Sequence, residues 1–251
     1  VGQSHHYETM AFSAFLSENI NFGFLDLRPG FRFEIFEQER VDRLAGSTYL
    51  DKTTAIVLPG VGFISDIGSI SLFGGFHRGF TPPSSGALKI VNFGEDISDG
   101  GLDLKSEKSW NKEIGIRGGL SIIEFEFSGF HVSVEDMVAA GRGTAFKNLG
   151  KVNTMGLETR TALAFSQINK FLPNVDVSYS FLNTEVIDGR IISNVSGSVG
   201  SEVDISGKEL PYAPAHTLMV GFTSNFNERF SLRIDSKYVS EVFTDFENIK
   251  K

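Results

Sequence analysis

The segment LDLRPGFRFEIFEQ, Leu25–Gln38, alternates apolar and polar residues along most of its length. Its apolar positions are Leu25, Leu27, Phe31, Phe33 and Ile35, and the polar positions between them include Asp26, Arg28, Arg32 and Glu34. Because a β-strand directs successive side chains to opposite faces, this pattern predicts a strand with one apolar face and one charged face. In a sandwich such an apolar face packs inward, whereas in a membrane barrel it contacts lipid.

Composition narrows the classes of protein to which the chain can belong. Its 251 residues carry a formal net charge of −8, which argues against a nucleic acid partner. It has no cysteine, so disulfides and thiol chemistry are excluded. We find no run of about 18 apolar residues, the length that a transmembrane helix needs. Since the chain opens at Val1 without a signal-peptide pattern, we expect it to be an internal piece of a longer protein.

Alternating segments recur along the chain, and helical periodicity is nearly absent. They predict ten strands, over residues 7–16, 24–38, 55–64, 69–80, 108–118, 122–135, 154–166, 175–187, 212–224 and 229–242. Several exceed the roughly 5–6 residues of a typical soluble strand and approach the roughly 9–11 of a tilted membrane strand. In the two most regular segments, one face is predicted to carry Leu157, Leu163, Val177 and Tyr179, and the other Glu158, Arg160, Asp176 and Ser178.

The segment 122–135 changes its parity partway. Its apolar residues lie at odd positions up to Phe127 and at even positions from Phe130 onward. An extra residue in one strand shifts the alternation in this way, so we expect a β-bulge at Ser128–Gly129.

The connections between the predicted strands alternate in length. Short ones are expected around residues 18–23, 65–68, 119–121, 167–174 and 225–228, and long ones around 39–54, 81–107, 136–153 and 188–211. An up-and-down membrane barrel has short periplasmic turns at one end and longer extracellular loops at the other. The sequence therefore predicts an all-β fold, an antiparallel up-and-down transmembrane β-barrel segment that supplies about ten strands of a larger barrel.

Five stretches carry a more specific pattern. They are LFGGFHRGFTPP (72–83), LKSEKSWNKEIGIRGG (104–119), NLGKVNTMGLETR (148–160), GKELPYAPAHTLMVGF (207–222) and VFTDFEN (242–248). In this order, over almost the whole chain, they resemble the barrel of TonB-dependent outer-membrane receptors. The version Gly75–Phe80 is most similar to the ferric-dicitrate and siderophore receptor branch.

The resemblance implies a fold, a cellular location and a set of binding partners. Receptors of this family are barrels of about 22 strands with a plugged lumen. Residues 1–251 would be part of such a barrel, without the plug, the terminal strands or the N-terminal region that contacts TonB. The resemblance implies an outer-membrane receptor of a Gram-negative bacterium, surrounded by lipid, that imports a ferric chelate (iron citrate or a siderophore) with energy from the TonB complex. It implies a transporter without a resident cofactor, not an enzyme.

Three alternatives stay open at this point. One is a soluble β-sandwich or adhesin-like binding module, against which strand length and loop sorting argue. Another is a receptor of the same family for a non-iron ligand such as cobalamin or an oligosaccharide. The last is a barrel-wall enzyme, which needs a Ser–His pair on one face; the sequence offers no convincing pair and hence no catalytic residue.

Candidate ligand contacts are basic residues of the barrel wall and mouth: His77, Arg78, Arg117 and Arg160. A guanidinium binds the carboxylates of an anionic chelate in a bidentate fork. Alternatively, these cations and the acidic residues of the same wall form a polar interior that ties strands and plug together. No metal site is predicted, because the acidic stretch Gly94–Asp103 lacks the regular aspartate spacing of a calcium loop.

Overall fold

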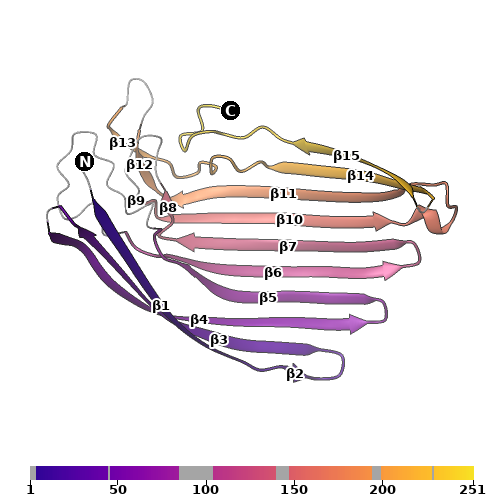
Figure 1. Ribbon diagram of the computed structural model, residues 1–251, viewed down its shortest axis with the longest axis horizontal. Helices are drawn as coiled ribbons and strands as arrows, with labels where there is room; N and C mark the ends of the chain where they lie inside the picture. The colour runs from indigo at the N-terminus through magenta and orange to yellow at the C-terminus, as the bar shows by residue number, and fades with distance from the viewer. Residues whose placement is uncertain (1–3, 45, 85–103, 140–146, 194–198, 228) are drawn as a thin grey trace.

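The computed structural model describes residues 4–44, 46–84, 104–139, 147–193, 199–227 and 229–251. Most of them form one antiparallel sheet (Figure 1). Its strands are β1 (His5–Ser17), β2 (Ile20–Asn21), β3 (Asp26–Asp42), β4 (Ser47–Ile67), β5 (Ile70–Thr81), β6 (Glu107–Leu120), β7 (Ile123–Glu135), β10 (Lys151–Leu163), β11 (Asn174–Asp188), β14 (His216–Asn227) and β15 (Phe230–Val239). Two short pairs stand apart, β8 (Val138–Ala139) with β9 (Lys147–Asn148), and β12 (Arg190–Ile192) with β13 (Glu202–Asp204).

The sheet is the predicted up-and-down meander. Each of the ten predicted strands is present, and the long strands are paired in chain order, with the short β2 added beside β3. The predicted segments 154–166 and 175–187 are β10 and β11, which are antiparallel neighbours. Since the long strands form one sheet, whereas a sandwich packs two, the soluble-sandwich alternative is wrong. No helix in the described ranges is long and apolar enough to cross a membrane; the one helical turn is a 3-10 helix at Phe165–Gln167.

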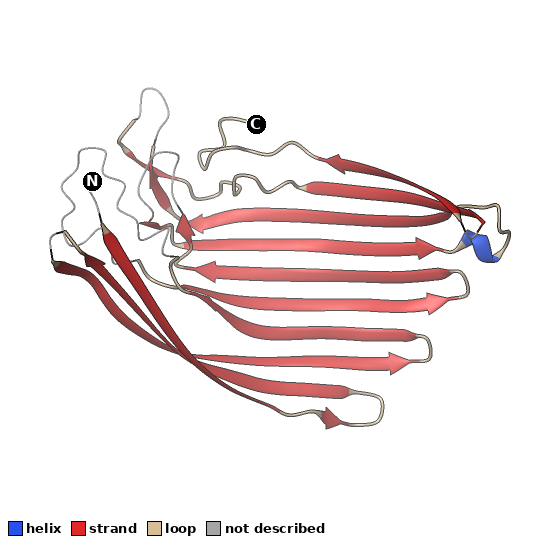
Figure 2. Cartoon of the chain, in the orientation of Figure 1, coloured by secondary structure: helices blue, strands red, loops and turns tan. Residues whose placement is uncertain are grey.

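The sheet is open and curved, and its two ends differ (Figure 2). Short turns, such as residues 68–69 and 121–122, join strands at one end. The connections after β5, β7 and β11 leave the other end, where the N-terminus also lies (Figure 1). We call these the turn end and the loop end. For these connections the predicted sorting of short and long is confirmed.

The predicted long connection 39–54 is wrong. There β3 continues to Asp42 and β4 begins at Ser47, so only residues 43–46 connect them. The two strands pair along this whole stretch, with one register irregularity at Arg40/Val41. Apolar alternation is lost in these residues although the strands continue. Backbone hydrogen bonds hold this part of the sheet together, and they do not require any pattern of side-chain polarity.

The predicted bulge at Ser128–Gly129 is also wrong. The pairing of β7 with β6 and with β10 runs without a register shift from Ile123 to Glu135. The parity changes because Phe130 lies on the face where Glu124 and Glu126 lie. Its ring occupies space that Gly156 leaves open, since a Cβ at Gly156 would lie 2.5 Å from Phe130 Cζ.

Cross-strand register separates the side chains of the sheet into two faces. The polar face includes Arg28, Arg32, Glu34, His77, Glu113, Arg117, Glu126, Glu158, Arg160, Asp176, Ser178, Arg233 and Asp235. The apolar face includes Leu27, Phe31, Leu72, Ile114, Ile116, Phe127, Leu157, Leu163, Val177, Tyr179, Phe222 and Ile234. The predicted division of the side chains of β10 and β11 is confirmed.

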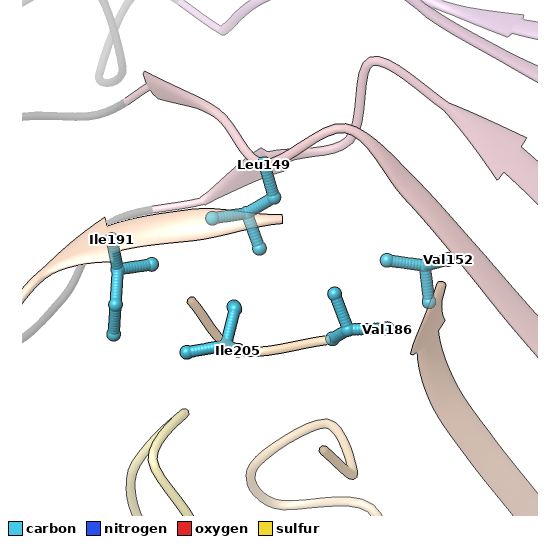
Figure 3. Close-up of a cluster of buried hydrophobic side chains, with 5 residues drawn as sticks. All are labelled: Leu149, Val152, Val186, Ile191 and Ile205. Carbon is cyan, nitrogen blue, oxygen red and sulfur yellow. The ribbon is translucent and has the colours of Figure 1, made fainter. Parts of the chain in front are cut away.

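The main buried cluster sits at the loop end of the sheet, where β10 begins and β11 ends. Figure 3 shows its side chains close together. The cluster consists of Leu149, Val152, Val186, Ile191 and Ile205. Val152 and Val186 lie opposite each other on the polar face of β10 and β11. The chain that follows β11 therefore folds over the polar face at this end, which explains why apolar residues occur there.

Candidate functional site

A hollow of about 700 Å³ lies on the sheet where β1, β3, β4 and β5 meet. Five glycines are among its lining residues, and two pairs of them face each other across strands: Gly30 opposite Gly60, and Gly62 opposite Gly75. A Cβ at Gly60 would lie 2.9 Å from the Cβ of His77. The absence of side chains at these positions opens the hollow and exposes backbone in it.

Four basic residues line this glycine hollow, and three of them, Arg28, Arg32 and His77, direct their side chains to the polar face. Arg32 is neutralised, because its guanidinium forms an ion pair with Glu34 and donates a hydrogen bond to Ser13 Oγ at 3.2 Å. The exposed side chains of Arg28 and His77 make no hydrogen bond or ion pair within the described part of the chain. Arg28 thus gives the hollow one uncompensated positive charge.

A second hollow, of about 460 Å³, lies further along the sheet between β6, β7 and β10. Arg117 and Arg160 both line it, and both lie opposite Glu126 in the strand register. The Arg117 guanidinium carbon also lies 5.5 Å from the centroid of the Phe73 ring. Because Glu124 lines this hollow too, its two guanidinium groups face two carboxylates. The balanced charges favour the polar-interior interpretation for this part of the wall.

Arg78 is not brought together with the other predicted residues. It borders the glycine hollow, but it follows His77 in an extended strand and so directs its side chain to the apolar face. There its guanidinium carbon lies 5.7 Å from the centroid of the Trp110 ring. The structure thus places His77 in one hollow, Arg117 with Arg160 in another, and the Arg78 head group on the opposite side of the sheet.

Residues of the recognised motifs join the connections at the loop end. Asn148 accepts a hydrogen bond from Lys105 N and donates to Lys105 O, both at 2.9 Å, and also donates to Asp136 O. Asn248 repeats this arrangement with Glu209, at 2.7 Å and 2.9 Å. Each asparagine amide imitates a backbone pair, so these motif residues have a structural role.

The hairpin β12–β13 has its own local polar contacts. Arg190 and Glu202 form an ion pair at 3.6 Å between exposed side chains. Hydrogen bonds from the Ser206 hydroxyl and backbone N–H lower the pKa of Asp204, with a smaller contribution from Arg190. These contacts shape the hairpin and its turn rather than a binding site.

Metal ligands do not gather anywhere in the described ranges: no three His, Asp or Glu side chains there are placed to hold an ion. The acidic stretch Gly94–Asp103 lies outside the described residues.

Sequence reasoning missed two features. It placed Arg28 on the polar face but did not single it out, because most of the glycines that line the hollow belong to the neighbouring strands β4 and β5. It also missed the contact of Arg78 with Trp110, although alternation alone places Arg78 and His77 on opposite faces. The contact of Arg78 with Trp110 could have been suspected from the sequence, because Trp110 is the only Trp of the chain and lies in a predicted strand, two residues before Lys112.

Comparisons with known proteins agree with the sequence resemblance. The family described as TonB dependent receptor-like, beta-barrel, matches residues 1–250. Among solved structures, the unliganded ferric citrate transporter FecA superposes with a TM-score of 0.77 at 19% identity, over 98% of this chain and 34% of that one. The siderophore receptor PiuA from Acinetobacter baumannii superposes with a TM-score of 0.76 at 17% identity, over 98% of this chain and 35% of that one. The ferric-catecholate import receptor Fiu from K12 E. coli superposes with a TM-score of 0.68 at 17% identity, over 95% of this chain and 35% of that one.

The chain therefore spans about a third of the length of these receptors. At such identities the likeness establishes the fold, and the predicted antiparallel barrel segment is confirmed.

Proposed function

Because the chain belongs to the TonB-dependent receptor β-barrel family, we propose that it is part of the wall of an outer-membrane receptor that binds and imports a ferric chelate. Residues 1–251 supply a run of barrel strands, and the plug and the TonB-contacting region lie in other parts of the receptor. Energy for import comes from the TonB complex of a Gram-negative bacterium. The family consists of receptors and transporters rather than enzymes.

Exposed apolar side chains support the membrane position. Large apolar residues on the apolar face stay accessible, among them Phe12, Phe31, Ile114, Leu157 and Ile234. At the turn end, exposed phenylalanines occur at three of the connections: Phe22 and Phe24 before β3, Phe171 before β11, and Phe226 and Phe230 at the β14–β15 turn. A band of apolar residues bounded by aromatic side chains is the pattern of a barrel wall in lipid. The polar face then lines the lumen.

The single observation that carries the ligand proposal is Arg28 in the glycine hollow, whose exposed guanidinium has no ion-pair or hydrogen-bond partner among the described residues. A ferric chelate built on carboxylates is an anion, and a guanidinium without a protein partner binds carboxylate strongly. His77 lies in the same hollow, and bare backbone lets a bulky chelate approach. We assign contact to Arg28 and His77, whereas Arg117 and Arg160, whose charges are balanced by Glu124 and Glu126, are assigned to the polar interior of the wall.

Titration of the intact receptor with ferric citrate tests this assignment. Arg28→Gln should weaken binding at least tenfold, since a hydrogen bond to a charged group contributes about 1.5–3 kcal/mol. The matched control is Lys237→Gln, which removes an exposed cation from the polar face of β15, away from the hollow. Equal affinities of Arg28→Gln and the parent would exclude the glycine hollow as the chelate site.

The family alternative is a receptor for a non-iron ligand. An uncharged oligosaccharide or cobalamin gains little from the charge of Arg28. If the receptor binds cobalamin and not ferric citrate, and Arg28→Gln leaves that binding unchanged, the non-iron alternative replaces the proposal.

A further inference from the structure

We propose that Gly62 and Gly75 form a bare backbone shelf on which the body of the chelate lies, and that these two positions determine the size of chelate that the glycine hollow accepts. The inference rests on the proposed function and deepens it, because it assigns specificity within the same site. It concerns two glycines that the fold itself does not require.

The five glycines of the hollow differ in the space around them. At Gly60 a Cβ would lie 2.9 Å from the Cβ of His77, and at Gly30 it would lie 3.0 Å from a backbone oxygen of β1. At Gly79 a Cβ would overlap the hydroxyl of a neighbouring serine. Packing within the sheet therefore explains why these three positions are glycine.

Gly62 and Gly75 have no such crowding within the described ranges. The nearest atom to a Cβ would be a backbone oxygen, 3.7 Å away at Gly62 and 3.6 Å away at Gly75, which are ordinary van der Waals distances. Neither residue has a positive φ, so an L-residue fits the backbone at both positions. The register of β4 with β5 runs without a shift, so no bulge calls for glycine there.

A glycine inside a strand weakens the strand, because it has no side chain to pack and loses more backbone entropy on folding. Without a bulge, a positive φ or a crowded Cβ, the remaining physical reason for such a glycine is the close approach of a ligand or of another backbone. Because Gly62 and Gly75 line the hollow that holds Arg28, we assign this approach to the chelate.

The shelf lies directly beside the charge on which the proposed function depends. Gly62 is opposite Gly75 on one side and opposite Arg28 on the other. Neighbouring strands are about 4.8 Å apart, so the Arg28 guanidinium can reach an anion that rests on the shelf. Glu113 lies opposite Gly75 at the far side, where its carboxylate repels an anion and so directs it toward Arg28.

Alanine substitutions in the intact receptor separate the fit of the chelate from the stability of the fold. Gly62→Ala and Gly75→Ala should each weaken ferric citrate binding roughly tenfold, since one misplaced methylene in a fitted pocket costs about 10–200-fold. Their denaturant midpoints should not fall below that of the parent, because alanine fits the backbone and restricts the unfolded chain.

Gly119→Ala is the matched control. Gly119 lies on the polar face of β6 beside the second hollow, and the nearest atoms to a Cβ there are 3.9 Å away. This substitution should change neither ferric citrate binding nor the denaturant midpoint. In Gly62→Ala the dependence of affinity on salt should also stay that of the parent, because the charge of Arg28 is intact.

A thiol on the shelf shows directly whether the chelate lies there, since residues 1–251 contain no cysteine. In the Gly62→Cys receptor the thiol should react readily with iodoacetamide, and gallium citrate, whose metal cannot oxidise a thiol, should protect it. The Gly119→Cys receptor should stay reactive in both conditions. A Gly62→Cys thiol that is unreactive without gallium citrate would show that another part of the receptor covers the shelf, which overturns the inference.

Failure of this inference and failure of the proposed function give different results. If the parent does not bind ferric citrate, the proposed function fails and the shelf fails with it. If the parent binds and Arg28→Gln weakens binding, but both alanine variants bind like the parent, the proposed function stands and only the inference is wrong. Lower denaturant midpoints in the alanine variants would also overturn it, because the fold would then require these glycines.

Discussion

Gly156 of β10 lies opposite Phe130 of β7, and the space that its missing side chain leaves is filled by the Phe130 ring. A Cβ at Gly156 would lie 2.5 Å from Phe130 Cζ and 2.6 Å from the backbone oxygen of Phe181. The backbone oxygen cannot move away as a flexible side chain does. We therefore expect Gly156→Ala to lower the free energy of unfolding of the intact receptor by about 1–3 kcal/mol, the usual cost of overpacking.

Gly129 is the matched control for this substitution. It lies on β7 beside Phe130, but the nearest atom to a Cβ there is 3.9 Å away. Gly129→Ala should leave the denaturant midpoint close to that of the parent. Equal midpoints for the two variants would show that Phe130 does not need the space at Gly156.

The depth of a residue on the apolar face should decide the cost of introducing a charge. Ile116 lies near the middle of the apolar stretch of β6, whereas Leu163 ends β10 beside the turn end. Ile116→Arg should cost about 2–4 kcal/mol, and Leu163→Arg about 0–1 kcal/mol. Ser180→Arg on the polar face, opposite Glu158, should be tolerated. Unfolding from lipid vesicles in urea measures all three, and equal costs would contradict the membrane position.

The asparagine pair at the loop end should control how firmly the connections are held. Asn148→Ala removes both hydrogen bonds to Lys105 and one to Asp136. Since each bond contributes about 0.5–1.5 kcal/mol, we expect faster hydrogen exchange at the Lys105 amide and faster proteolysis nearby. Asn169→Ala is the control, because the Asn169 amide oxygen only accepts a bond from Phe171 N at the other end of the sheet. Unchanged exchange in Asn148→Ala would contradict this role.

Ionic strength should distinguish contact at Arg28 from contact with uncharged groups. The Debye length falls from about 30 Å at 0.01 M to about 10 Å at 0.1 M salt, so attraction between the exposed guanidinium and an anionic chelate is increasingly screened. The affinity for ferric citrate should fall over this range, and it should fall less in Arg28→Gln. A parent affinity independent of salt would argue against an electrostatic site in the glycine hollow.

The sequence by itself determined the strands and their faces. Side-chain direction alternates along every strand, so the apolar and polar faces of β3, β10 and β11 were predictable from polarity alone. The sorted connections predicted the meander, and the motif residues predicted the family. Prediction failed where the polarity pattern does not follow the strand pairing. The strands β3 and β4 stay paired beyond the alternating residues. At Phe130 the change of parity comes from a ring that fills the space beside Gly156, and not from the expected bulge.

Only the tertiary structure decided which residues lie beside one another across strands. Gly30, Gly60 and Gly75 come from different strands, so no local sequence pattern predicts the hollow that they open beside Arg28. Arg78 and Trp110 are opposite each other only because β5 and β6 pair in one particular register. Alternation of polarity excludes a shift of the pairing register by one residue, because that shift would move every side chain to the other face. A shift by two residues keeps every side chain on its face but changes every cross-strand neighbour, so alternation does not exclude it. The faces are thus a property of the sequence, whereas the sites on them depend on long-range pairing.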